Sequence, residues 1–524
     1  MAVALLLIGA TPVSAAQPAA APAASQNYFD VHEYRVLGNT TLSNLDIETV
    51  LYPLLGDHKT LADVEIARAA LEKNYHDRGY STVFVDIPEQ DVSDSIVRLK
   101  VTEGRLNEVR ISGARYFSER KILAALPSAA AGDVPNVPVL QGQLSEINVK
   151  TADRSVVPIL KAGPRPGTVD LALKVDDHLP FHGSLEIDNQ NTPGTKPLRA
   201  TASLSYTNLF GQFDSLAFQY QAAPQSVHDV NVIAANYSWG SIPGGITPSI
   251  YVIDNSSNVA TFGTLGVLGK GQVYGAHVSF PLTDALGSPQ TLTLGVDYKH
   301  FDQSIRVAST TAPTIDDFQT PISYLNLSLA YAGSWATDKL FGSLGASVNF
   351  GPRGAPNDQL MFANKRFKGQ SNYFYVKLDS SLALHLPKGF QILLRADGQY
   401  AIEPLITNED FAISGADGVR GYYEAEALAD VGLKGSVQLQ SPVFKWGELP
   451  VGDLFVFVDA GEAYPISSLP GEPAYTRLHS AGAGLNLFPG RPLSGTLTWA
   501  DPMSTGPNTR RGDSRFLFTV RGAF

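Results

Sequence analysis

The chain of 524 residues contains no cysteine, and only 17% of its residues are charged. Without cysteine, disulfide scaffolds, thiolate metal sites and thiol catalysis are all excluded. Long apolar runs are scarce as well, because beyond the extreme N-terminus no window approaches the roughly 18 residues that a membrane-spanning helix needs. If the chain enters a membrane, it must therefore cross as strands.

Clusters of basic residues are also missing. The formal net charge is -11, and no stripe of Lys and Arg provides the surface on which nucleic-acid binding depends. The sequence has no Gly-x-Ser-x-Gly elbow, no His-Glu-x-x-His zinc helix and no Walker loop. Glu424 and Glu426 could suggest acid/base work in a barrel hydrolase, but no nucleophile accompanies them. We therefore predict a protein that is not an enzyme, uses no metal or cofactor and binds no nucleic acid.

Residues 1–16 have the apolar core and small residues of a signal peptide, with cleavage expected after Ala15 or Ala16. A basic segment before the core is missing. Two alternatives therefore stay open: a start codon a little further upstream, or a buried helix of a soluble domain. Residues 17–27 are rich in Ala and Pro and are predicted to be a spacer.

Two α+β modules are predicted next, at residues 28–104 and 105–177. Each has the order strand, helix, helix, strand, strand (βααββ). In the first module, Ser43 and Thr60 are the expected helix N-caps and Gly79 ends the second helix. The predicted elements of the two modules are strands Tyr28–Val36, Thr82–Ile87 and Ser95–Val101, then strand Leu106–Ile111, helix Ser118–Leu126, a helix within Val139–Ala152, and strands near Val157–Leu160 and Val169–Val175. A pair of small ferredoxin-like binding domains is the alternative.

From residue 181 to residue 524, helical periodicity gives way to alternation of polar and apolar residues. Thr291–Lys299 is the clearest case. Such segments persist for about nine to eleven residues, which is long for a soluble sandwich but sufficient to cross a bilayer at a tilt. About sixteen strands are predicted, an even number that closes an antiparallel transmembrane barrel. They start near His182, Arg199, Asp214, Asp229, Thr247, Gly271, Gln290, Thr320, Leu340, Ser371, Gly389, Asp430, Gly452, Ser480, Ser494 and Arg515.

Two charged residues stand out in this barrel pattern. Arg420 lies in a predicted extracellular loop, residues 402–429, and Gly418 and Gly421 beside it permit a tight backbone path. Asp459 is in phase with Phe457, and we assign that face to the lumen because a charge facing lipid is costly. A loop folded back into the pore would bring the Arg420 guanidinium onto the Asp459 carboxylate in a bidentate pair.

The whole pattern resembles the two-partner secretion transporters, or hemolysin secretion/activation proteins. The resemblance covers Tyr28 to Phe524 through two modules similar to POTRA domains, the second expected to be of the ShlB type, and through two motifs. The first motif is VRGY at Val419, Arg420, Gly421 and Tyr422. The second is the FVDAG strand with Phe457, Asp459 and Gly461.

The resemblance implies roles for these residues. The VRGY loop would occupy the pore and pair with Asp459, Glu424 and Glu426 would be further charged loop residues, and Phe524 would be the terminal signal read by the barrel assembly machinery. Two departures limit the comparison. Residues 17–27 are too short and too rich in Pro to form the plug helix common in the family, and Tyr423 stands where a basic residue is frequent.

The function implied is an outer-membrane pore, with POTRA domains in the periplasm, that moves an unfolded exoprotein to the cell surface. The expected partners are a large, strand-rich exoprotein encoded nearby, the barrel assembly machinery and outer-membrane lipid. POTRA domains capture such chains by adding them as a strand to a sheet edge. A barrel-insertion factor of the same superfamily is the main alternative, although such factors typically have three or more POTRA modules. A passive porin would lack these modules.

Overall fold

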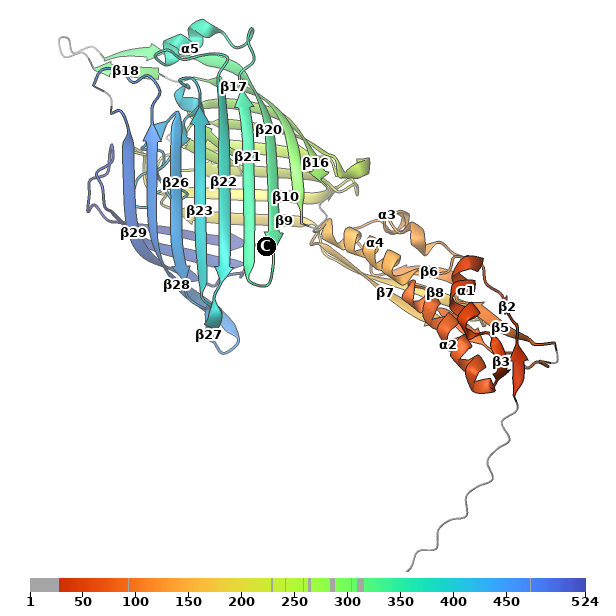
Figure 1. Ribbon diagram of the computed structural model, residues 1–524. Helices are drawn as coiled ribbons and strands as arrows, with labels where there is room; N and C mark the ends of the chain where they lie inside the picture. Colours follow the sequence, from red (N-terminus) through yellow and green to blue (C-terminus); the bar gives the residue numbers. More distant parts are fainter. Residues whose placement is uncertain are drawn as a thin grey trace, which may run out of the picture. The chain divides into compact units, whose positions relative to one another are not determined.

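The computed structural model describes residues 28–524 except 93, 228–229, 241, 258, 263–264, 283–287, 303, 309–314 and 472. The predicted signal peptide and spacer lie outside the described residues. The chain divides into two compact units, Met1–His178 and Leu179–Phe524 (Figure 1). No helix in the described part of the chain is long and apolar enough to span a membrane.

The first module of unit 1 contains the predicted helices. They are α1 (Asn44–Leu51) and α2 (Leu61–Asp77). Thr60 and Asp63 form a reciprocal capping box at the start of α2, and Gly79 follows the helix with a φ of 93°. The helices cover a sheet of strand order β2-β5-β4, made of β2 (Glu33–Leu37), β4 (Val83–Asp86) and β5 (Ile96–Glu103).

The first strand differs from the prediction. Tyr28–Val36 is not one strand, because the backbone N–H groups of His32 and Glu33 both donate to the Ser95 carbonyl and break the ladder. Before the break, β1 (Phe29–Val31) pairs instead with a strand that the sequence did not reveal, β3 (Gly56–Lys59). β3 shows no alternation of polar and apolar residues, since it contains only polar residues and Gly. The pattern used to predict strands is therefore missing from it.

The second module repeats the topology of the first. Its sheet has the order β6-β8-β7, with β6 (Arg105–Ser112) parallel to β8 (Thr168–Asp177) and β7 (Arg154–Ala162) antiparallel to it. Its helices are α3 (Glu119–Ala124) and α4 (Val137–Val149). A middle strand with one parallel and one antiparallel neighbour is common to both modules, so the repeat is one of topology.

Unit 2 is a closed antiparallel barrel of sixteen strands in the described residues. A short hairpin strand, β27 (Phe444–Trp446), extends one turn. The barrel strands are β9 (Phe181–Asp188), β10 (Arg199–Leu209), β11 (Asp214–Ala222), β12 (Asn231–Ser238), β13 (Thr247–Asn255), β16 (Gly271–Leu282), β17 (Gln290–Phe301), β20 (Ile322–Ala336), β21 (Leu340–Phe350), β22 (Phe374–His385), β23 (Gln391–Ala401), β26 (Val431–Gln440), β28 (Leu449–Tyr464), β29 (Thr476–Leu487), β30 (Leu493–Pro502) and β31 (Arg515–Ala523).

The connections between these strands carry smaller elements. Two hairpins stand on their own, β14 (Val259–Phe262) with β15 (Leu265–Leu268) and β18 (Ser304–Ala308) with β19 (Ile315–Gln319). Helix α5 (Gln359–Lys365) lies between β21 and β22. Barrel strands are 8 to 16 residues long, so several exceed the predicted length. The longest, β28, begins three residues before the expected Gly452.

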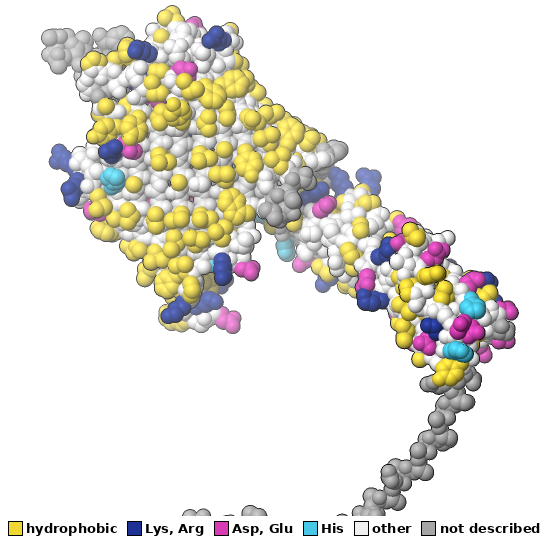
Figure 2. Space-filling view, viewed as in Figure 1, with side chains coloured by type: hydrophobic (Ala, Val, Ile, Leu, Met, Phe, Trp, Pro, Cys, Tyr) yellow, Lys and Arg dark blue, Asp and Glu magenta, His cyan; other side chains and the backbone are white. Residues whose placement is uncertain are grey.

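The outward face of the barrel is apolar. On β28, Leu454, Val456 and Val458 are each more than half exposed. Phe457 and Asp459, which alternate with them along the strand, are buried. Figure 2 shows hydrophobic side chains spread over the barrel strands, with few charged groups among them. The alternation thus places apolar side chains on the outward face and turns the other face to the lumen, as the sequence predicts.

Candidate functional site

The loop of residues 402–429, hereafter the VRGY loop, connects β23 to β26. Its two arms pair with each other through β24 (Phe411–Ala412) and β25 (Leu428–Ala429). Beyond this short ladder, the chain forms a tip whose residues contact inward-facing side chains of the barrel. The loop therefore lies inside the barrel.

Arg420 and Asp459 form the expected bidentate pair. The Arg420 Nε lies 2.8 Å from one carboxylate oxygen and Nη2 lies 2.7 Å from the other. The backbone N–H of Arg420 also donates to the carboxylate, at 3.1 Å. The Asp459 side chain is fully buried and that of Arg420 is 15% exposed, so the pair is largely removed from water.

Arg420 donates further guanidinium N–H groups to β26. Nη1 donates to Gln438 at 2.9 Å and Nη2 to Ser436 at 2.9 Å. The guanidinium also stacks on the ring of Phe457, 3.4 Å from its centroid. Arg420 thus joins two adjacent strands, and lysine could not reproduce this fork of contacts.

The residues beside Arg420 fit the tip to the wall. Val419 is fully buried against Ile413, and the pair lies over Gly461 of β28. A Cβ at Gly461 would come within 3.0 Å of Val419 and 3.2 Å of Ile413. The missing side chain at this position leaves the space that the loop tip occupies against the strand. Gly421 has a φ of 95°, which a residue with a side chain rarely adopts.

Tyr422, Glu424 and Glu426 make three different contacts. The buried Tyr422 hydroxyl bonds to the carbonyls of His479 and Ser504, which ties the tip to β29 and to the connection after β30. Glu424 accepts the N–H of Ala416 at 2.6 Å and so closes the tip on itself. Glu426 accepts the Thr509 hydroxyl at 2.6 Å.

Phe524 lies apart from the loop, on the outward face at the seam of the barrel. Its side chain is 73% exposed, its ring packs near Phe181 with centroids 6.0 Å apart, and its backbone bonds to that of Gly183 in both directions, at 3.0 and 3.1 Å. Phe516, which has the same phase in the alternation of β31, is exposed on the outward face as well.

Sequence reasoning missed Ser436 and Gln438. Both are in phase with Lys434 on β26 and therefore face the lumen, a signal that the alternation of this strand contains. Nothing local marked them as partners of Arg420. In the described part of the chain, no group of three or more His, Asp or Glu side chains is placed to hold a metal ion.

Comparison with known families settles the class. A model of the haemolysin secretion/activation proteins ShlB/FhaC/HecB matches residues 167–487. The chain belongs to this family. A ShlB-type POTRA model matches residues 29–104, the first module, so the type that we expect for residues 105–177 stays a prediction there.

Individual relatives agree with the family. The chain is 22% identical over 501 residues to the heme/hemopexin transporter protein HuxB of Haemophilus influenzae, covering 92% of this chain and 85% of that protein. It is 26% identical over 212 residues to the outer membrane transporter CdiB of Dickeya dadantii, covering 40% and 37%.

Solved structures share the fold. CdiB from Escherichia coli superposes with a TM-score of 0.62 at 20% identity, covering 97% of this chain and 92% of the other. BamA from Haemophilus ducreyi lacking POTRA domains 1–3 gives 0.57 at 14% identity, covering 95% and 100%. The BamA likeness is one of fold alone, and the family match does not favour a barrel-insertion factor.

This member of the haemolysin secretion/activation family is an outer-membrane transporter with its POTRA region in the periplasm. It supports the export of a secreted exoprotein partner, and its family consists of transporters.

Proposed function

We propose that the two modules bind the exoprotein as an unfolded chain and that it reaches the surface through the barrel as the VRGY loop rearranges. The observation that carries this proposal is the loop itself. It occupies the inside of the barrel and is held there by the buried pair of Arg420 and Asp459. Hydrogen bonds and ion pairs can break and reform, so a loop held by them can yield to a passing chain.

A sheet edge in the second module supports the binding step. β7 is an outer strand of its sheet, pairing with β8 alone in the described residues, and it exposes Val157 and Ile159. An added strand would gain main-chain hydrogen bonds and side-chain contacts there. Pro158 cannot donate, so we expect the bonds to form on either side of it.

Three further points complete the proposal. Translocation needs no chemical catalysis, because folding of the exoprotein outside the cell can bias the movement. The exoprotein is large, strand-rich and encoded nearby. The barrel assembly machinery recognises Phe524, and outer-membrane lipid surrounds the apolar outward face of the barrel strands.

Deletion of the gene in its own organism tests the function. Secreted proteins and outer-membrane barrels would be compared by mass spectrometry before and after deletion. We expect one large exoprotein to disappear while the barrels stay unchanged. A general fall in barrels would instead indicate an insertion factor.

Complementation of the deletion strain tests the role of the loop. Arg420→Ala should lower exoprotein secretion at least tenfold, because it removes the side-chain bonds that hold the loop tip on β26 and β28. Removing one partner of a buried pair also typically costs about 3 to 5 kcal/mol of stability, so the folding of the variant is measured as well. Arg477→Ala, which removes an exposed arginine of β29, is the control. A folded Arg420→Ala barrel that secretes at the native rate would contradict the proposal, and heat-modifiable mobility on gels reports the folding.

A further inference from the structure

The VRGY loop makes a second set of contacts, which lies outside both of its motifs. Residues 405–410, which we call the outer segment, precede the β24–β25 ladder and include a short helical turn, η5 (Thr407–Glu409). Glu409 ends this turn, and its side chain is only 2% exposed. A buried carboxylate is costly unless charged or polar partners surround it.

Glu409 has three such partners, each on a different barrel strand. One carboxylate oxygen accepts Lys299 Nζ of β17 at 2.6 Å and the Tyr324 hydroxyl of β20 at 2.5 Å. The other oxygen accepts the Tyr375 hydroxyl of β22 at 2.6 Å. All three bonds involve an ionised acceptor and are therefore stronger than neutral ones.

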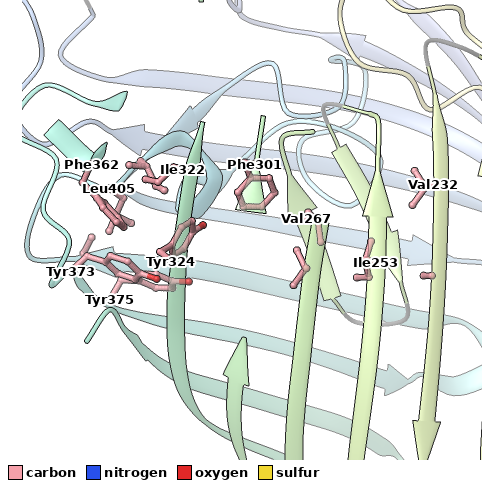
Figure 3. Packing of buried hydrophobic residues seen from close by; sticks show 14 of the residues in the cluster. Val232, Ile253, Val267, Phe301, Ile322, Tyr324, Phe362, Tyr373, Tyr375 and Leu405 are labelled. Carbon is pink, nitrogen blue, oxygen red and sulfur yellow. The ribbon is translucent and has the colours of Figure 1, made fainter. Parts of the chain in front are cut away.

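Neighbouring residues hold the outer segment in the same place. The Glu409 carbonyl accepts the Gln399 side chain at 3.0 Å, and the Asn408 side chain donates to the Leu268 carbonyl at 2.7 Å. Leu405 and Ile406 are buried in one hydrophobic cluster with Tyr324, Phe362, Tyr373 and Tyr375. Figure 3 shows Leu405 beside the aromatic rings of this cluster.

The two sets of contacts share no residue. Arg420 contacts β26 and β28, whereas Glu409 contacts β17, β20 and β22, on another part of the wall. Between them, the β24–β25 ladder joins the arms of the loop. Breaking the Arg420 pair therefore loosens the tip without removing any bond to Glu409.

We propose that Glu409 is a second anchor of the VRGY loop, which holds the outer segment against the barrel wall independently of Arg420 and Asp459. The tip can then move while the outer segment stays in place. This inference rests on the proposed role of the loop in the pore, and it adds a positioning residue for which neither motif gives a sign.

Because the chain has no cysteine, one introduced thiol reports on one position. The probe is Thr407→Cys, at a half-buried position of the outer segment, labelled on intact cells with a membrane-impermeant maleimide. In this background, Glu409→Gln should speed labelling about tenfold, since an amide can replace neither the charge nor all three acceptor contacts. The control is Glu403→Gln in the same loop, whose carboxylate accepts one N–H, from Phe374 at 3.3 Å. Equal labelling rates in the two folded variants would overturn the proposal.

Two more variants keep the test decisive. If Glu409→Gln fails to assemble, Tyr375→Phe removes one hydroxyl and keeps the ring, and an unchanged labelling rate in that variant would overturn the proposal. Arg420→Ala should leave the rate at Thr407→Cys near that of the parent. If it accelerates labelling as much as Glu409→Gln does, the anchors are not independent. Labelling needs no exoprotein, so native-rate secretion by a folded Arg420→Ala barrel together with the expected labelling rates would count against the proposed function alone.

Discussion

At the residue scale, the site depends as much on missing side chains as on charged ones. Arg420 and Asp459 provide the attraction, but Val419 can approach β28 only because position 461 has no side chain. Sequence reasoning selected Gly461 through its motif, and the contact distances give the physical reason. The same reasoning could not select Glu409, because a single acid in a loop of many polar residues has no local signature.

Substitution of Gly461 tests this fit. Gly461→Val should displace the tip, because even a Cβ would lie 3.0 Å from Val419, and overpacking of this kind typically costs about 1 to 3 kcal/mol. We expect a folded barrel with secretion reduced several-fold. Gly522→Val is the matched control, since nothing lies within 4 Å of a Cβ there. Equal secretion by both folded variants would show that the tip does not rest on this strand.

At the element scale, one buried acid links the two modules of unit 1. Glu103, at the end of β5, accepts backbone N–H groups of Thr40 and Thr41 at 2.7 and 2.9 Å and a bond from Arg105 of β6 at 2.7 Å. Burial alone would raise the pKa of Glu103, but the hydrogen bonds from Thr40 and Thr41 and the charge of Arg105 hold it below its usual value.

Because the pKa of Glu103 is lower in the folded state, the stability that this residue contributes changes with pH in a known direction. The stability from Glu103 is present above the unfolded-state pKa near 4.5 and is lost as the pH falls through the lower folded-state pKa. Glu103→Gln should therefore destabilise unit 1 by about 1 to 3 kcal/mol at pH 7, and this difference should shrink below pH 4.5. The helical circular dichroism signal during heating checks it, with Glu108→Gln, at a half-exposed residue, as control. A difference that does not change with pH would contradict this role.

At the scale of the whole molecule, the chain closes on itself where β31 meets β9. The last residue takes part, because the Phe524 backbone pairs with Gly183 while its ring faces outward. The Phe524 backbone thus extends the seam that Thr519–Ala523 form with Ser184–Asp188, and we propose that its exposed ring is the signal that the assembly machinery reads.

Phe524→Ala separates these two roles, since it keeps the backbone bonds and removes the ring. If the ring is the assembly signal, folded barrel in the outer membrane should fall several-fold, as measured by heat-modifiable mobility. Phe516→Ala removes another exposed ring from the same strand and should have little effect. A similar loss in both variants would assign the effect to lipid contact instead.

The sequence by itself determined the strand period, the approximate strand number, the inward face of Asp459 and the helix N-caps at Ser43 and Thr60. All of these depend on neighbours within a few residues, where side-chain alternation and capping act. It missed β3, whose pairing with β1 has no local pattern.

Only the tertiary structure decided which side chains meet across the lumen. Glu409 reaches Lys299, 110 residues earlier in the chain, and Arg420 reaches Ser436 and Gln438 as well as Asp459. Such contacts depend on the stagger of the closed barrel and on the path of the VRGY loop within it. Both are set by the packing of the whole chain, which no local pattern contains.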